Sequence, residues 1–172
     1  MTTPVESLLT EGLKAGFVKG GTSKEEVWVG PFQVKSSERV ILDPETEEVT
    51  GHYIDQWTPG RLGGGQELVQ VGDERAIRLY AGGTLPEEEL IKLGTNHDEI
   101  MTYLTDKITA LGEQTRLGKP CRPDPDGLWQ YAYEILRKDV DGIPVRVSLE
   151  TIAFKDTTVY AHPLIQSPIE QS

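Results

Sequence analysis

The sequence predicts an α+β fold in which a curved, mostly antiparallel sheet of hairpins packs on one long helix. Short apolar runs with period-two alternation are joined by tight turns at Gly72–Glu74 and Asp141–Gly142, which is typical of antiparallel hairpins. Apolar residues recur three or four positions apart from Ile100 to Leu111, and this spacing predicts the main core helix. Short N-terminal and middle helices complete the expected architecture.

The two short helices are expected where a threonine precedes a glutamate by three positions. In such a capping box the hydroxyl and the carboxylate each accept a hydrogen bond from a backbone N–H group of the first turn. Thr3 and Glu6 predict one helix near the N-terminus. Thr84 and Glu87 predict a second helix, which Gly94 would end.

Strands are expected on both sides of these helices. A turn is expected at Asp43–Thr46, where proline fixes φ and aspartate can bond its own backbone. Gly118–Gly127 holds three prolines and two glycines in ten residues, so it predicts a surface loop. The runs that predict strands are residues 27–34, 39–42, 53–57, 67–71, 75–80, 129–135, 145–149 and 158–161.

Length and composition indicate a single domain over residues 1–172, with an ordered core at about 4–164 and a frayed tail at 165–172. The formal charge of −11 repels phosphate backbones and anionic lipid, so neither direct nucleic-acid binding nor membrane binding is expected. Cys121 is the only cysteine, which excludes an intrachain disulfide and a cysteine-cluster metal site. The N-terminal segment carries acids where a signal peptide carries bases, so a cytoplasmic location is expected.

The stretch His52–Gly83 holds the densest group of residues that could line a site. Strand alternation places Tyr53, Asp55 and Trp57 on one face. Aromatic rings with polar tips suit either a core or a ligand pocket. Together with Glu67, these residues indicate an aromatic and acidic pocket.

Three short motifs give the chain a resemblance to an uncharacterised bacterial domain family of similar length. The motifs are Tyr53-x-Asp55-x-Trp57, then Gly65-x-Glu67, then Tyr80-x-Gly82-Gly83. The likeness covers about residues 8–162. Some relatives are similar domains fused to helix-turn-helix regulators, which implies a sensing or regulatory role. The chain departs from the family at Pro59–Arg61, which replaces a simpler turn, and at Arg78, where relatives are more apolar. The family has no settled activity, so the resemblance carries none over to this chain.

Three acids could carry chemistry. Asp55, Glu67 and Glu150 could form a carboxylate pair or bind a divalent metal ion through oxygen ligands. Acid/base work requires two of them to lie close together with pKa values pushed apart. The favoured interpretation is structural: Asp55 would accept hydrogen bonds from backbone N–H groups of the glycine loop. His162 is of interest because it ends a strand near the expected position of Glu150.

The loop Gly63–Gly65 could wrap an anion with its backbone N–H groups, as phosphate loops do. It lacks the Gly-Lys-Ser/Thr ending and leads into a strand, so a tight turn or bulge is favoured. The turn Lys19–Lys24 is open to the same two interpretations. His52, His97 and His162 lack the spacing of metal ligands, so no histidine metal centre is predicted.

The leading interpretation is a small cytoplasmic ligand-binding or regulatory domain whose partner is a small molecule or another protein. One alternative is a small hydrolase-like enzyme that uses a carboxylate pair, with or without a divalent metal ion. Another is a protein-interaction module that presents an exposed sheet edge or the proline loop. The sequence identifies neither the ligand, nor a cofactor, nor the oligomeric state. The residues expected to bind the ligand are Tyr53, Asp55, Trp57, Gly65, Glu67, Tyr80, Glu150 and His162.

Overall fold

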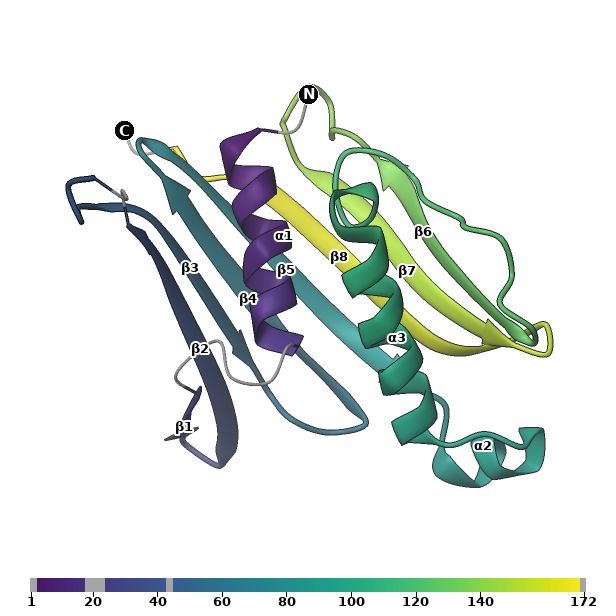
Figure 1. Cartoon of the computed structure of the whole chain (residues 1–172). Helices are drawn as coiled ribbons and strands as arrows, with labels where there is room; N and C mark the ends of the chain where they lie inside the picture. The colour runs from purple at the N-terminus through teal and green to yellow at the C-terminus, as the bar shows by residue number, and fades with distance from the viewer. Residues whose placement is uncertain (1–2, 18–23, 43–44, 171–172) are drawn as a thin grey trace.

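The computed structural model describes residues 3–17, 24–42 and 45–170, and it confirms a mostly antiparallel α+β fold (Figure 1). Eight strands form one sheet in the order β1-β2-β3-β4-β5-β8-β7-β6, and each neighbouring pair is antiparallel. The strands are β1 Lys24–Val29, β2 Phe32–Leu42, β3 Val49–Trp57, β4 Leu62–Val71, β5 Glu74–Thr84, β6 Trp129–Arg137, β7 Arg146–Phe154 and β8 Thr157–Pro168. The helices are α1 Pro4–Phe17, α2 Glu87–Leu93 and α3 His97–Leu111, and a 3-10 turn follows at Gly112–Gln114.

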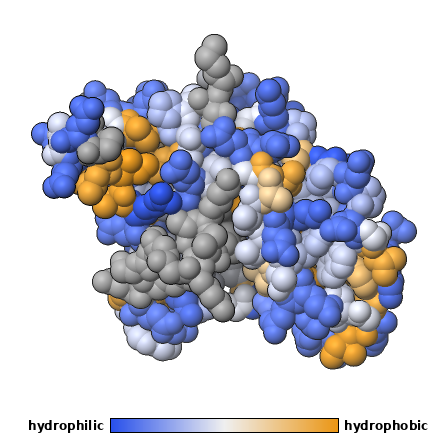
Figure 2. Space-filling model, viewed as in Figure 1, coloured by the Kyte–Doolittle hydropathy of each residue, from blue (hydrophilic) through white to orange (hydrophobic). Residues whose placement is uncertain are grey.

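Both longer helices lie on the same face of the sheet, with α1 over β3–β5 and α3 nearer β7 (Figure 1). The buried apolar residues form two separate clusters. Under α1, Leu8 and Leu9 pack with Tyr53 and Val69. Under α3, the cluster comprises Leu90, Ile100, Leu104, Ile108, Tyr131, Tyr133, Ile152, Phe154, Val159, Tyr160 and Leu164. Viewed from the side of the helices, the surface is mostly hydrophilic, and apolar residues show in separate areas near its margins (Figure 2).

The expectation of one long helix is wrong, because α1 has 14 residues and α3 has 15. The first capping box forms as predicted, since the backbone N–H groups of Thr3 and Glu6 each donate to the side chain of the other residue. Gly12 brings α1 close to the sheet, because a Cβ at that position would lie 2.4 Å from the ring of Tyr53. The sheet is therefore covered by two helices of similar length.

The second predicted capping box does not form, because Thr84 belongs to β5. Pro86 is the N-cap residue of α2, which has no side-chain cap and ends at Gly94 as predicted. Asn96 caps α3 and accepts a hydrogen bond from the backbone N–H of Glu99 at 2.9 Å. Within the described ranges, no helix is long and apolar enough to cross a membrane.

The C-terminal segment does not fray at residue 165, since β8 continues to Pro168, which pairs with Ala76 of β5. Ile165 lies between β5 and β7 in register with both, so this part of β8 is held on both sides. The turn predicted at Asp43–Thr46 lies partly outside the described residues, and the turn at Lys19–Lys24 lies almost entirely outside them.

Candidate functional site

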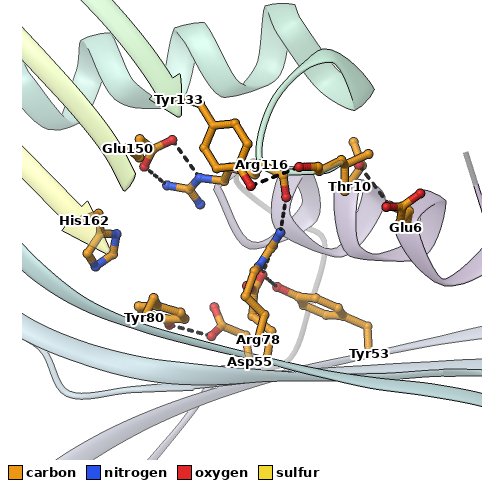
Figure 3. Close-up of polar contacts among 12 residues, drawn as sticks. Glu6, Thr10, Tyr53, Asp55, Arg78, Tyr80, Arg116, Tyr133, Glu150 and His162 are labelled. Carbon is orange, nitrogen blue, oxygen red and sulfur yellow. Dashed lines mark hydrogen bonds and ion pairs between the residues drawn. The ribbon is translucent and has the colours of Figure 1, made fainter. Parts of the chain in front are cut away.

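The face of the sheet beneath the helices carries buried charged residues between the two apolar clusters. Alternation along each strand places Glu67 of β4, Arg78 of β5 and Glu150 of β7 on this face. Arg116, from the loop after the 3-10 turn, joins them. Each of these four side chains has at most 7% of its surface exposed. A buried charge is tolerated only when it is paired, and the structure pairs these four two by two. Figure 3 shows the pair of Arg116 and Glu150.

The first pair joins Glu67 to Arg78. Arg78 donates from Nη2 to Glu67 Oε1 at 2.7 Å and from Nε to the other carboxylate oxygen. Tyr53 donates its hydroxyl to Glu67 Oε1 at 2.7 Å. Burial alone would raise the pKa of Glu67, but the charge and hydrogen bonds of Arg78 and the Tyr53 hydroxyl lower it below its ordinary value. Glu67 is therefore an ionised carboxylate whose two oxygens are both occupied.

The second pair joins Glu150 to Arg116. Arg116 donates from Nε to Glu150 Oε1 at 2.8 Å and from Nη2 to Oε2. Tyr131 donates to Oε1 at 2.6 Å, and Tyr160 donates to Oε2 at 3.4 Å. Arg116 adopts a φ of 58°, an uncommon conformation for a residue with a Cβ. The two pairs are linked, because Arg78 Nη1 donates to the backbone carbonyl of Arg116 at 3.0 Å.

Asp55 differs from the other buried acids of this site. Its Oδ1 accepts a hydrogen bond from the Tyr80 hydroxyl at 2.6 Å (Figure 3). Among the described residues, no arginine, lysine or histidine forms an ion pair with it, and no second donor reaches it. Asp55 is also the cross-strand partner of the ionised Glu67. Burial, followed by repulsion from Glu67, raises the pKa of Asp55 to about 7.

His162 approaches the same space from β8. Its Nδ1 shares a hydrogen bond with the Tyr160 hydroxyl at 2.7 Å, and its ring meets the Tyr80 ring edge-on with centroids 5.2 Å apart. Burial and the nearby charge of Arg116 lower the pKa of His162 to about 4. At neutral pH the imidazole is therefore uncharged and does not neutralise Asp55.

These side chains surround a cavity of about 470 Å³ between the sheet and α3. The wall of the sheet is polar, with Asp55, Tyr80 and His162. The wall of α3 is apolar, with Met101 and Leu104. The β3–β4 turn and glycines of β4 and β5 complete the lining, whose other members are Trp57, Thr58, Pro59, Gly60, Arg61, Gly63, Gly64, Glu67, Gly82, Gly83, Thr84, His97, Arg116 and Tyr160.

A larger hollow of about 1070 Å³ lies beside the start of α3. Its acids, among them Asp98, Asp106 and Asp126, are exposed. Tyr103 and Trp129 stack beside it with ring centroids 5.0 Å apart. Water already solvates these acids, so, unlike the partly buried Asp55, they do not need a ligand to stabilise their charge.

Five residues of the predicted site reach the cavity wall, namely Asp55, Trp57, Glu67, Tyr80 and His162. Tyr53 and Glu150 are not part of the lining: Tyr53 bonds Glu67, and Glu150 bonds Arg116. Gly65 acts by its lack of a side chain, since a Cβ there would lie 2.6 Å from the Tyr80 hydroxyl oxygen.

The favoured interpretation of Asp55 needs correction, because its hydrogen bond comes from Tyr80 and not from the glycine loop. The prediction of a glycine loop or turn is also wrong, because Gly63–Gly65 lie in β4 and pair with β5. The backbone N–H of Thr58 donates to the Gly64 carbonyl at 3.0 Å. Asp55 and Glu67 do lie side by side, whereas Glu150 is held apart by Arg116. In the described ranges no three histidine, cysteine or acidic residues are grouped as metal ligands.

Sequence reasoning missed the contributions of Arg116, Tyr160, Met101 and Leu104 to this site. Arg116 stands in an irregular segment with no periodicity, so nothing in the sequence indicates where its side chain points. Met101 and Leu104 belong to the amphipathic pattern of α3, which predicts that they face the sheet. The same pattern is typical of a filled core, so it does not predict a cavity.

Comparisons of this chain with models of known protein families, with curated proteins and with solved structures found no match. The resemblance to an uncharacterised bacterial domain family therefore stays a prediction. Function is argued from the site, because a fold class alone does not determine it.

Proposed function

We propose that this chain is a small-molecule-binding domain, acting in the cytoplasm, whose ligand occupies the cavity between the sheet and α3. The observation that carries the proposal is Asp55, a carboxyl group that lines a cavity of about 470 Å³ and has no cationic partner among the described residues. Ligand pockets typically measure about 300–1,000 Å³ and combine an apolar lining with a few convergent polar groups. This cavity fits that description, since Met101 and Leu104 face Asp55, Tyr80 and His162.

The two buried ion pairs support the proposal because they fix the walls of the cavity before any ligand arrives. Both carboxylates are held through two oxygens, and tyrosine hydroxyls add further hydrogen bonds. Replacing such a pair by apolar residues is often neutral or stabilising, so stability alone does not require two of them. Preorganised polar walls lower the free energy lost when a ligand is ordered.

One observation favours the hydrolase-like alternative. Asp55 and Glu67 are neighbours whose pKa values are shifted in opposite directions, as in many acid/base pairs. Glu67, however, is bonded to Arg78 through both oxygens and to Tyr53, so it is not free to exchange a proton with a substrate. Only Asp55 remains available, and a single acid suits binding better than hydrolysis by a carboxylate pair.

A second candidate function is protein interaction through the β1–β2 hairpin. β1 is an edge strand of the sheet, and Trp28 and Phe32 beside its turn are 68% and 62% exposed. Exposed edges and exposed aromatic residues are features of partner-binding surfaces. At the other edge of the sheet, Cys121 exchanges backbone hydrogen bonds with Tyr133 of β6, so part of that edge is covered.

Filling the cavity is expected to abolish ligand binding. In the variant Met101→Trp the larger side chain of α3 enters the space that the ligand would occupy. We expect a fragment library, screened against the wild-type chain by saturation-transfer-difference NMR, to give hits whose signals fall at least fivefold with Met101→Trp.

The matched control is Thr109→Trp, which adds the same side chain at an exposed position of α3. This variant should retain the hits of the wild-type chain. A library without hits, or hits whose signals are unchanged in Met101→Trp, would count against the proposal. Either result would favour protein interaction through the β1–β2 hairpin.

A further inference from the structure

The charges around the cavity cancel except at two positions. Glu67 is neutralised by Arg78, and Arg116 is neutralised by Glu150. His162 is uncharged at neutral pH. The remaining acids and arginines of the lining are Asp55 on the sheet wall and Arg61 in the β3–β4 turn, and His97 on α3 shares a hydrogen bond with the Thr84 hydroxyl at 3.3 Å.

Asp55 and Arg61 have different surroundings. Arg61 is exposed, so water solvates its guanidinium, and its Nη1 donates to the backbone carbonyl of Thr84 at 2.5 Å. Asp55 is partly buried and receives, from the part of the chain that the structure describes, a single hydrogen bond, on Oδ1. An ionised carboxylate removed from water is stabilised by a positive charge and by further hydrogen bonds. A positively charged group bound in the cavity next to Asp55 would therefore stabilise the ionised carboxylate.

Anionic ligands are disfavoured by the same geometry. Arg116 already uses Nε and Nη2 to bind Glu150. Arg78 is engaged by Glu67 and by the Arg116 carbonyl. The interior cations of the site are thus committed to interior acids, and an anion entering the cavity would meet Asp55 and the Tyr80 hydroxyl oxygen.

The other lining residues suit an organic cation. Trp57 and Tyr80 place aromatic rings in the lining beside Asp55 (Figure 3 shows Tyr80 with Asp55). Aromatic faces attract cations through the negative potential above the ring. Met101 and Leu104 of α3 offer an apolar surface to the body of the ligand.

We propose that the ligand of this cavity is an organic cation, with a primary ammonium or amidinium head bound to the Asp55 carboxylate and an apolar body against Met101 and Leu104. This inference rests on the proposed small-molecule-binding function and names its ligand class. An amidinium or ammonium head supplies two or more donors, so it can satisfy Oδ2 as well as the charge.

Binding of such a cation should strengthen as pH rises through 7. The groups that face Asp55 are Glu67 on β4, Arg78 and Tyr80 on β5, His162 on β8, and Arg116 from the loop. Of these, Glu67 and the arginines stay ionised and His162 stays uncharged between pH 6 and 8. Among these groups Asp55 is the one that changes charge in this interval, and the Asp55→Asn variant separates its effect from that of His97, which also lines the cavity from α3.

The test compares aromatic probes of similar shape that differ in charge. Benzamidine, benzamide and benzoate form one set, and benzylamine, benzyl alcohol and phenylacetate form a second. Isothermal titration calorimetry or NMR titration at pH 8 should give cation affinities at least tenfold above those of the neutral probes. The cation affinity should fall about tenfold at pH 6, as the ionised fraction of Asp55 falls.

Asp55→Asn should remove the preference for cations at pH 8, and Asp73→Asn, which deletes an exposed acid of the β4–β5 turn, should preserve it. The pH comparison on the wild-type chain tests the same point without any substitution. Neutral or anionic probes that bind as well as the cations, through contacts that Met101→Trp blocks, would overturn the inference and leave the proposed function intact. If no probe and no library fragment binds, both fail.

Discussion

The variant Glu150→Ala is expected to lower the free energy of unfolding by about 3–5 kcal/mol, because it leaves the Arg116 guanidinium buried without its counter-charge. The Glu150 side chain is fully buried and accepts hydrogen bonds from Arg116, Tyr131 and Tyr160. Four donor groups from these three residues would therefore lose their acceptor at once. Urea denaturation followed by circular dichroism measures the change.

The matched control is Glu134→Ala. Glu134 belongs to the neighbouring strand β6, and this variant breaks its ion pair with Arg122. That pair is more than half exposed on both sides, so its loss should change stability by less than about 1 kcal/mol. The double variant Arg116→Met/Glu150→Met should recover most of the loss, since apolar residues can replace a buried pair. Equal effects of Glu150→Ala and Glu134→Ala would contradict the assignment of a buried, paired charge.

The second large effect concerns how the free energy of unfolding depends on pH. Asp55 and His162 contribute with opposite signs, and the two contributions largely cancel in the unsubstituted chain. The pKa of Asp55 is raised from 3.8 to about 7, so between these values the folded state binds a proton that the unfolded state has lost, and stability falls as pH rises. The pKa of His162 is lowered from 6.5 to about 4, so the unfolded state holds the extra proton there, and stability rises with pH. Each contribution amounts to about 3–4 kcal/mol at most.

Single substitutions should separate the two contributions. Asp55→Asn removes the contribution that lowers stability as pH rises. The stability of this variant should therefore rise steadily from pH 4 to 6.5 and exceed that of the wild-type chain at pH 8. His162→Asn removes the contribution that raises stability with pH, so the stability of this second variant should fall from pH 4 to 7. Urea midpoints measured at half-unit pH steps test this, and parallel profiles for the three proteins would contradict it. A residue whose loss stabilises the free protein and weakens binding is serving function and not folding.

Some features of the site could be predicted from the sequence because they depend on local periodicity. Period-two alternation placed Tyr53, Asp55 and Trp57 on one face, and the structure confirms it. Alternation does not say which face will be covered. In β7 the apolar Val147 and Leu149 share one face, yet the covered face carries Ser148 and Glu150.

Other features could not be predicted because they depend on long-range pairing. The cavity exists because β8 adds to β5, a pairing of strands separated by α2, α3, β6 and β7. That contact brings His162 beside Tyr80. Arg116 comes from a segment without regular structure, and the two ion pairs meet only after the sheet has formed. The prediction of one long helix is wrong for another reason: α1, which was expected to be short, has 14 residues against 15 in α3, and it packs on Tyr53 through Leu8 and Leu9.

Both proposals depend on Asp55 lining the cavity with no cationic partner among the described residues. The titration of the Asp55 side-chain carboxyl carbon by ¹³C NMR in the free protein tests this dependence, with Asp55→Asn used to assign the resonance. The account predicts a midpoint near pH 7. It also predicts a lower midpoint in the presence of saturating benzamidine, because a bound cation favours the ionised form. A midpoint near the ordinary value of 3.8 in the free protein would contradict the account, since it would show that water or an existing partner already satisfies the charge.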